Sequence, residues 1–312
     1  MRMRALLMLN PNAGVGRGAR VAQGLATYFR RLGVEVELKT ALSREEGIRV
    51  ASQAREAWGT ERWGVFLVAG GDGTVNSAVQ ALAGSDVPVG ILPVGVGNVA
   101  ARQLGLPLSL RQACQAAVFG ETRAIDLGVA NGRPFLSMAG IGFDAAVVHS
   151  VRPQMKKRLG ALAYVLRALR AATQYRYVPI SVRIEDGGAR VVERVEENWF
   201  VVVANGPTYS YRWKAVPWAA MDDGELDICM FGKTRVWGIS AQVIYALLGR
   251  HLALPSVLYR RAQRIHIEAS SRAAGQSSEQ ACVQVDGEPA GFTPVQVSCL
   301  AGALKVKMPG AG

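Results

Sequence analysis

The sequence predicts a doubly wound α/β domain over residues 1–127, followed by an antiparallel β domain over residues 128–299. In the first range, apolar runs of strand length alternate with stretches whose apolar residues repeat at the 3.6-residue period of a helix. In the second range, short alternating strands and hairpin signals replace that pattern. A chain of 312 residues also exceeds the size at which single hydrophobic cores usually stop growing, so two domains are expected.

Strands and helices alternate along the first domain. Four segments are predicted to be strands, at 5–9, 34–39, 65–69 and 87–92. Periodicity, capping boxes and glycine stops predict helices over 22–32, from Ser43-x-x-Glu46 onward, from Thr74, near 98–104, and from Ser109-x-x-Gln112 to Gly120. This order is typical of a parallel sheet with helices on both faces.

The second domain has fewer helical signals. Asn131-Gly132 and Asp186-Gly187-Gly188 each lie between apolar runs, so both predict hairpins. Helices are predicted only around 155–174 and 236–248.

Composition limits the class of protein. The four cysteines form no C-x-x-C pair and do not cluster with the three histidines, so neither a disulfide framework nor a zinc site is predicted, and a reducing cytosol is favoured. The first apolar run ends at Asn10-Pro11-Asn12 and is too short for a signal peptide. No uncharged stretch reaches 18 residues, so no membrane-spanning helix is predicted.

The net charge of +12 is concentrated in two stretches without carboxylates. Eight lysines and arginines lie between Asp144 and Glu185, and six lie between Asp227 and Glu268, among aromatic and aliphatic residues. A basic, apolar surface suits an anionic membrane face. An ordinary solvated basic surface is the alternative. Nucleic-acid binding is a third interpretation, but no recognised nucleic-acid motif accompanies the charge.

The most informative motif is Gly-Gly-Asp-Gly-Thr-Val-Asn at residues 70–76, between a predicted strand and a predicted helix. Such a junction binds phosphate, because unpaired backbone N–H groups and the positive end of the helix dipole face the ligand. A carboxylate beside phosphates is repulsive unless a cation lies between them. Asp72 therefore indicates a nucleotide bound with a divalent metal, and phosphoryl transfer as the chemistry.

Two further glycine-rich loops join a strand to a helix, at 10–18 and 93–98. The carboxyl ends of parallel strands meet at one edge of a sheet, so the three loops are expected to converge on one ligand site. The first loop is too long for a dinucleotide-binding turn, and the Walker A and protein-kinase signatures are absent from the sequence. Taken singly, each loop is also compatible with a simple tight turn.

Several motifs follow one another in a specific order along the chain. The first three are N-P-x-A-G from Asn10, G-G-D-G-T-x-N from Gly70 and P-x-G-x-G-N-x-x-A-x-x-L-G-L-P from Pro93. The later ones are Ile125-Asp126-Leu127-Gly128, Ile141-Gly142-Phe143-Asp144-Ala145, Asp222-Asp223-Gly224-Glu225-Leu226-Asp227 and Val285-Asp286-Gly287-Glu288. Together they resemble the diacylglycerol kinase catalytic-domain family, which includes bacterial lipid kinases, sphingosine kinases and ceramide kinases.

This resemblance implies a first domain related to NAD kinase and phosphofructokinase, a β-sandwich second domain, and ATP and Mg²⁺ as cofactors. The family's last strand commonly returns to the first domain, which would place 300–312 there. Nucleotide contacts are implied for Asn10, Pro11, Asn12, Ala13, Gly14, Thr40, Gly70, Gly71, Asp72, Gly73, Thr74, Val75, Asn76, Gly95, Val96 and Asn98.

The resemblance also implies two metal environments. Asp126 would belong to the water network of the catalytic Mg²⁺. The carboxylate of Asp223 and the backbone carbonyls of Ala220 and Glu225 would form a separate structural Mg²⁺ site, with the oxygen ligands that this ion prefers. An exposed acidic turn is the alternative for that segment.

Asp286-Gly287-Glu288 is the candidate for proton transfer. On a strand, residues i and i+2 face the same side, so both carboxylates would enter one site, and paired carboxylates raise one another's affinity for protons. A plain Asp-Gly hairpin turn is the alternative. The resemblance implies that Glu288 is the proton acceptor, with Asp286 as its catalytic neighbour and Asp72 acting at the phosphates.

Three positions depart from the pattern of many bacterial diacylglycerol kinases. Val96 and Val99 stand where a threonine and an aspartate are common, and Ser77 stands where glutamate is usual. Sphingosine kinases and some bacterial relatives also lack that aspartate. The departures weaken a specific assignment to diacylglycerol and leave a catalytically weak protein as an alternative.

The expected function is ATP- and Mg²⁺-dependent phosphorylation of a hydroxyl on a diacylglycerol- or sphingoid-like lipid. The expected partners are that lipid and an anionic membrane surface, bound peripherally at the cytoplasmic face, without nucleic acid. A homodimer is left open. The rivals are a soluble metabolite kinase of the NAD-kinase type, which shares G-G-D-G-T, and a non-catalytic nucleotide or lipid sensor.

Overall fold

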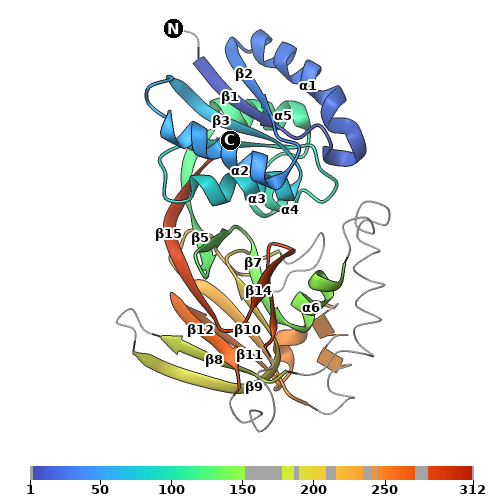
Figure 1. Cartoon of the computed structure of the whole chain (residues 1–312), viewed down its shortest axis with the longest axis vertical. Helices are drawn as coiled ribbons and strands as arrows, with labels where there is room; N and C mark the ends of the chain where they lie inside the picture. Colours follow the sequence, from blue (N-terminus) through green and yellow to red (C-terminus); the bar gives the residue numbers. More distant parts are fainter. Residues whose placement is uncertain are drawn as a thin grey trace. The chain divides into compact units, whose positions relative to one another are not determined.

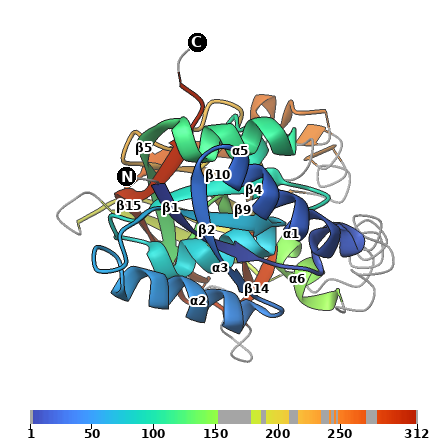
Figure 2. The same cartoon turned by 90° about the horizontal axis from the view of Figure 1, so that it is seen from above.

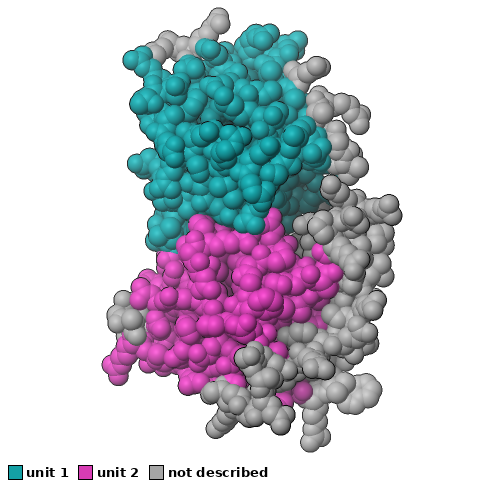
Figure 3. Space-filling view, viewed as in Figure 1, with its two compact units in different colours: residues 1–127, 221–223, 300–312 teal, residues 128–220, 224–299 magenta. Residues whose placement is uncertain are grey.

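The chain forms two compact units, which Figure 3 shows in different colours. Unit 1 comprises residues 1–127, 221–223 and 300–312, and unit 2 comprises residues 128–220 and 224–299. The structure is a computed structural model, and it describes residues 3–151, 178–185, 190–208, 216–234, 241–242, 245–246, 248–270 and 280–310.

Unit 1 contains a parallel sheet in the order β2-β1-β3-β4. All four predicted strands are present, as β1 (Met3–Leu9), β2 (Val34–Thr40), β3 (Trp63–Gly70) and β4 (Pro88–Pro93). The last strand, β15 (Val295–Met308), pairs with β4 in parallel, with Lys305 opposite Pro88. Because the strands are parallel, the loops that follow β1, β3 and β4 leave the sheet at the same edge.

Helices cover both faces of this sheet (Figure 2). α1 (Ala13–Arg31) and α5 (Leu110–Phe119) lie on one face, where Phe29 and Ala117 share a buried cluster with Leu7 of β1. α2 (Arg44–Glu56) and α3 (Asp72–Leu82) pack together against β1 and β3, and the short α4 (Val99–Gln103) follows β4. Burial of a side chain such as Phe29 contributes about 1.5–3 kcal/mol to the stability of the fold. The buried core therefore holds the strand ends, from which the loops extend, in fixed positions.

Local sequence accounts for the limits of two helices only in part. Ser43 caps α2 as predicted, because its Oγ accepts the Glu46 N–H at 3.2 Å. α5 ends before Gly120 as predicted. Ser109 precedes α5 without a side-chain capping bond, so the capping prediction there is wrong.

The first glycine-rich stretch is mostly helical. α1 begins at Ala13, so the loop after β1 consists of Asn10, Pro11 and Asn12. A Cβ atom on Gly18 would overlap the carbonyl oxygen of Asn10. The predicted loop over 10–18 is therefore wrong in length, because Gly18 serves the close packing of the helix on the loop.

Unit 2 is built from antiparallel strands around the long β9 (Val191–Ala204). The second half of β9 lies between β7 (Met138–Gly142) and β10 (Leu226–Gly232), and its first half pairs with β8 (Ile180–Glu185). β5 (Glu121–Ala130) runs from unit 1 into unit 2 (Figure 1). Further elements of unit 2 are β6 (Arg133–Phe135), α6 (Phe143–Ser150), the 3-10 helix η1 (His251–Ala253), β11 (Val257–Ala262), β12 (Arg264–Ala269), β13 (Cys282–Val285) and β14 (Glu288–Phe292).

The core of unit 2 is a cluster of aliphatic side chains from the facing strands. It includes Ile141 of β7, Val182 of β8, Val201 of β9, Ile265 of β12 and Val283 of β13, all fully buried. Each strand contributes alternate residues to the cluster, which is the pattern of two sheets packed face to face. The unit is therefore a β-sandwich.

Of the two predicted hairpins, one is confirmed and the other lies outside the described residues. Asn131-Gly132 forms the tight turn between β5 and β6, with φ of 45° and 79°, so that prediction is confirmed. Asp186-Gly187-Gly188 lies outside the described residues, although Glu185 of β8 is paired with Val191 of β9. The predicted helix at 155–174 and most of that at 236–248 also lie outside them. Within the described part of the chain, no helix is long and apolar enough to cross a membrane.

We expect Gly128→Ala to lower the free energy of unfolding by about 1–3 kcal/mol, the usual effect of overpacking a core. Gly128 of β5 is paired with Phe135 of β6, and a Cβ atom on Gly128 would overlap the fully buried Phe135 ring. Urea unfolding measures the change. The control is Gly24→Ala on α1, where a new Cβ meets nothing within 4 Å, and which should be neutral or slightly stabilising. Equal midpoints for the two variants would contradict the prediction.

Candidate active site

The loops after β1 and β3 meet at the carboxyl edge of the parallel sheet. The Asn10 N–H donates to the Ala69 carbonyl at 3.0 Å, and the Asn10 Nδ2 donates to the Thr74 Oγ1 at 3.3 Å. The Asn10 Oδ1 accepts the Asn12 N–H at 2.9 Å, which fixes the turn into α1. Asn10 therefore joins the first loop to the first turn of α3.

The loops after β3 and β4 are in backbone contact. The Gly70 carbonyl accepts the N–H groups of Val94 and Gly95 at 3.0 and 3.1 Å. A Cβ atom on Gly95 would lie 2.5 Å from the Gly71 Cα, so this approach requires glycine. The three loops therefore meet, as expected from the order of the strands.

Asp72 is the first residue of α3 and binds the loop after β4. Its Oδ1 accepts the Ala100 N–H, in the first turn of α4, at 3.0 Å. Asn98 precedes α4 with φ of 47° and no side-chain cap, and its Nδ2 donates to the Gly95 carbonyl at 2.9 Å. Asp72 thus provides from a neighbouring loop the capping bond that Asn98 does not make.

The other predicted nucleotide contacts lie on or beside these loops. Thr40 ends β2 directly opposite Leu9 of β1, at the same sheet edge. The Val96 side chain, in the loop after β4, is 75% exposed. The rest belong to the loop after β1 and to the first turns of α1 and α3: Pro11, Asn12, Ala13, Gly14, Gly73, Thr74, Val75 and Asn76.

Ser77, which stands where glutamate is usual, faces α2. Its side chain is buried, and its Oγ donates to the Gly73 carbonyl at 3.0 Å. A Cβ atom on Gly47 of α2 would lie 2.9 Å from the Ser77 Cβ, so the two helices are in close contact there. A glutamate at position 77 would have no room beside α2, so Ser77 serves helix packing in this chain.

Asp126 is buried in β5 and holds two segments that are distant in sequence. Its Oδ1 accepts the Gly302 N–H at 2.7 Å, and its backbone N–H donates to the Met221 carbonyl at 2.6 Å. Asp126 therefore fixes the start of the bend that leads into β10, which is the segment predicted to bind a structural Mg²⁺.

The bend itself offers oxygen ligands. The Asp223 side chain is exposed, and Gly224 turns the chain with φ of 75°. The Glu225 carboxylate is paired with Arg261 at 3.0 Å, so the role implied for Glu225 falls on its backbone carbonyl. Across the described residues, no three or more His, Cys, Asp or Glu side chains gather as a metal cluster. One carboxylate with backbone carbonyls still fits Mg²⁺, and the site stays a prediction.

Asp286 and Gly287 form a two-residue turn. Their φ values are 48° and 76°, β13 ends at Val285 and β14 begins at Glu288. The predicted strand geometry, with Asp286 and Glu288 on one side of a strand, is therefore wrong. The hairpin alternative is correct, because Asp-Gly favours a turn in which both residues have positive φ.

The Asp286 carboxylate is held by backbone N–H groups just before and at the start of β7. Its Oδ1 accepts the N–H groups of Ser137 and Met138 at 2.8 and 3.0 Å, and its Oδ2 accepts that of Leu136 at 2.8 Å. Burial raises the pKa of Asp286, while these N–H groups and Arg133 oppose the rise. Burial, rather than a paired carboxylate, is thus the main cause of its raised proton affinity, and the side chain anchors the turn.

Glu288 opens β14 and forms an ion pair with Arg133 of β6. The Arg133 Nη2 donates to the Glu288 Oε2 at 2.6 Å, and its Nη1 donates to the Pro289 carbonyl at 2.9 Å. The two side chains are 18% and 24% exposed. Sequence reasoning missed Arg133, because 155 positions separate it from Glu288. Its place directly after the Asn131-Gly132 turn is the local signal that could have drawn attention to it.

The motif around Asp144 supports the same turn. The Gly287 N–H donates to the Gln284 Oε1 at 2.8 Å, and the Gln284 Nε2 donates to the Asp144 Oδ2 at 2.9 Å. A Cβ atom on Gly140 would lie 2.5 Å from the Asp144 carboxylate, so the Asp144 and Gln284 side chains would have to shift to admit one. Sequence reasoning noticed Asp144 through the resemblance and missed Gln284.

Comparison with known proteins decides the family. The diacylglycerol kinase catalytic domain matches residues 4–130, and the YegS C-terminal NAD kinase β-sandwich-like domain matches residues 137–308. A diacylglycerol kinase of Mycobacterium tuberculosis is 30% identical, over 98% of this chain and 95% of that protein. The chain belongs to the diacylglycerol kinase catalytic-domain family.

Two further relatives support the same family assignment. A diacylglycerol kinase of Bacillus subtilis is 27% identical, over 98% of this chain and 96% of that protein. The crystal structure of a diacylglycerol kinase from Bacillus anthracis has a TM-score of 0.72 and 25% identity, over 98% of this chain and 97% of that one. The predicted family and fold class are confirmed. The protein is a kinase, and the family uses ATP as phosphate donor.

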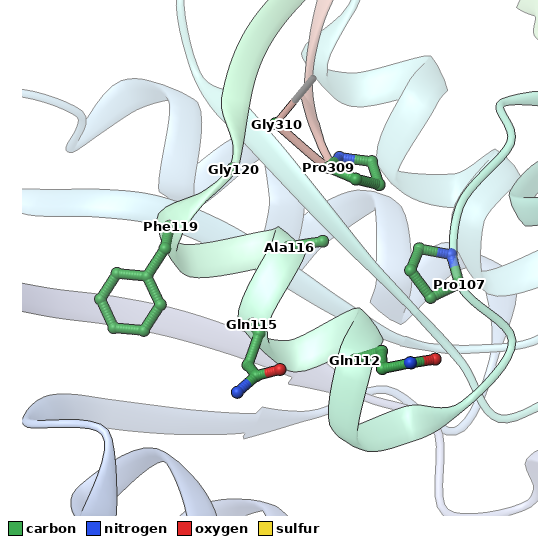
Figure 4. A pocket seen from close by; sticks show the side chains of 8 residues that line it. All are labelled: Pro107, Gln112, Gln115, Ala116, Phe119, Gly120, Pro309 and Gly310. Carbon is green, nitrogen blue, oxygen red and sulfur yellow. The ribbon is translucent and has the colours of Figure 1, made fainter. Parts of the chain in front are cut away.

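The kinase also has a surface hollow in unit 1, beside the end of α5 (Figure 4). It is lined by Pro107, Gln112, Gln115, Ala116, Phe119, Gly120, Pro309 and Gly310. None of the residues predicted to bind nucleotide or metal, or to transfer a proton, lines this hollow. It therefore does not belong to the candidate active site.

We expect Gly95→Ala to weaken ATP binding by about tenfold or more, a loss of about 1.4 kcal/mol. The added Cβ would lie 2.5 Å from the Gly71 Cα and would push two of the three loops apart. Isothermal titration with ATP measures the change. Gly24→Ala on α1 is the control, because a Cβ atom there meets nothing within 4 Å and Gly24 lies outside the candidate site. Equal ATP affinities for the two variants would contradict the prediction.

Proposed function

We propose that this kinase transfers the γ-phosphoryl group of ATP, in a Mg²⁺-dependent reaction, to a hydroxyl of a diacylglycerol- or sphingoid-like lipid. The observation that carries the proposal is the convergence of three strand-to-helix loops around Asp72 in a member of this family. The names of the relatives from Mycobacterium tuberculosis and Bacillus subtilis support a lipid acceptor.

The donor half of the reaction would use the loops of unit 1. Backbone N–H groups in the first turns of α1 and α3 are suited to phosphate oxygens. The approach of Gly95 to Gly71 makes a backbone cradle that a Cβ atom would fill, which fits a close phosphate. Mg²⁺, when bound, supplies the positive charge that allows phosphates beside the Asp72 carboxylate. Asp72 would orient the metal's water ligands, and catalysis would come mostly from positioning and charge neutralisation.

The bend before β10 would support this half of the site. The Asp223 carboxylate with the carbonyls of Ala220 and Glu225 would hold a second Mg²⁺ and stiffen the bend. Asp126, whose backbone N–H donates to the Met221 carbonyl at the start of that bend, would belong to the water network of the catalytic Mg²⁺.

The acceptor half would use the hairpin of unit 2. Glu288 would accept the proton of the lipid hydroxyl as its oxygen attacks the γ-phosphorus, a role worth typically about 10²–10⁴-fold in rate. Asp286 would keep the turn in place through its bonds to Leu136, Ser137 and Met138.

A lipid acceptor implies work at a membrane, so we also propose peripheral binding at its cytoplasmic face. The basic stretch between Asp144 and Glu185 lies largely outside the described residues. In the second stretch, the exposed Tyr245, Leu248 and Arg250 combine apolar and basic character. Such a combination suits an anionic lipid surface.

The direct test is transfer of radiolabel from ATP to lipid. We expect labelled product from anionic vesicles that contain diacylglycerol or sphingosine, and loss of that product when Mg²⁺ is chelated. Labelling of NAD in solution would favour a metabolite kinase instead. ATP binding without label in any lipid would favour a sensor and contradict the proposal.

The matched variant is Glu288→Gln, which keeps the size of the side chain but cannot take up the proton as a carboxylate does. We expect its lipid phosphorylation to fall by about 10²–10⁴-fold while ATP affinity is retained. Turnover like that of the wild type would remove Glu288 from its proposed role.

A further inference from the structure

The carboxylate of Glu288, the proposed base, is bound by the guanidinium of Arg133, which lies in another hairpin. Arg133 donates from Nη2 to the Glu288 Oε2 at 2.6 Å and from Nη1 to the Pro289 carbonyl at 2.9 Å. We propose that Arg133 is a positioning residue for this kinase: it selects the orientation of the Glu288 carboxylate and stabilises its charge. The inference rests on the proposed function, since it takes Glu288 as the proton acceptor.

The two donor bonds of Arg133 reach different parts of the same strand. One binds the Glu288 side chain and the other binds the backbone of the next residue, so the carboxylate is fixed relative to β14 itself. A guanidinium can do this because its donors lie in a rigid planar fork, whereas an ammonium is a single charged centre. Because the Glu288 carboxylate is already oriented, its side chain does not have to lose conformational freedom in each reaction cycle.

Arg133 is in turn presented by a fixed backbone. It directly follows the Asn131-Gly132 turn and pairs with Ala130 of β5. Asn131 exchanges two bonds with Gln296 of β15: its N–H donates to the Gln296 carbonyl and its Oδ1 accepts the Gln296 N–H, each at 2.9 Å. A positioning group works only if its own support is rigid, and this hairpin meets that requirement.

Arg133 also offsets the negative charge around the hairpin. Asp286 lies in the turn before Glu288, and α6, which packs on β13 and β14, carries Asp144 and His149. The Asp144 carboxylate accepts from Gln284, and the His149 Nε2 lies 2.8 Å from the Val283 carbonyl. Arg133 therefore places its positive charge beside Glu288 in a region that also holds two further carboxylates.

The test compares Arg133→Gln and Arg133→Lys with Arg183→Gln. Arg183 makes a similar ion pair with Glu268, at 2.9 Å and with side chains 33% and 31% exposed, between β8 and β12. It is the matched control for losing an Arg–Glu pair in unit 2. The measurements are kcat and KM for ATP in lipid phosphorylation, with thermal unfolding of each variant.

For Arg133→Gln we expect kcat to fall about tenfold or more and KM for ATP to stay within about twofold. Arg133→Lys should recover only part of kcat, because lysine keeps the charge and loses the fork. Arg183→Gln should keep the wild-type kcat. If Arg133→Gln does not fold, the lysine variant carries the test.

An Arg133→Gln enzyme with the kcat of Arg183→Gln would overturn the inference. Arg133→Gln could also lower kcat by the same factor in the wild-type and in the Glu288→Gln backgrounds. That result would overturn the inference too, because Arg133 would then not act through Glu288. A wild-type protein that phosphorylates no lipid would instead contradict the proposed function, which keeps the two failures distinct.

Discussion

The donor half of the candidate site depends on the hydrogen bond from the Ala100 N–H to the Asp72 carboxylate. At 3.0 Å it joins the loop after β3 to the loop after β4, and it replaces the cap that Asn98 does not make. The bond from Asn10 to Thr74 then ties in the loop after β1. This carboxylate lies where phosphates are proposed to bind, so a cation is needed there to offset the repulsion.

The acceptor half of the site in unit 2 follows the same principle. The Asp286 carboxylate accepts three backbone N–H bonds and so fixes a turn, and the neighbouring Glu288 is fixed by Arg133. In each unit, therefore, an acidic side chain of the family's motifs anchors backbone as well as contributing charge. Glycine contributes separately in each motif: Gly95 permits the close approach to Gly71, and Gly287 has the positive φ that the turn after Asp286 requires.

Features set by local sequence were predictable, whereas features set by tertiary pairing were not. The four parallel strands, the Ser43 cap and the Asn131-Gly132 turn each depend on a few adjacent residues, and all three predictions are correct. The pairing of Arg133 with Glu288 and the packing of Ser77 on Gly47 join distant segments, and a single sequence carries no signal for such contacts. The i, i+2 spacing of Asp286 and Glu288 also gave a wrong prediction, because the preference of Asp-Gly for a turn outweighed the strand geometry that the spacing assumed.

The most direct test of the donor site is Asp72→Asn. Asparagine keeps an oxygen that can accept the Ala100 N–H, so the loops should stay in place, but it removes the charge proposed to orient the metal. We expect the unfolding midpoint to change little and lipid phosphorylation to fall by about a hundredfold or more, with a higher Mg²⁺ concentration at half-maximal rate. Wild-type turnover with an unchanged Mg²⁺ dependence would contradict the role given to Asp72.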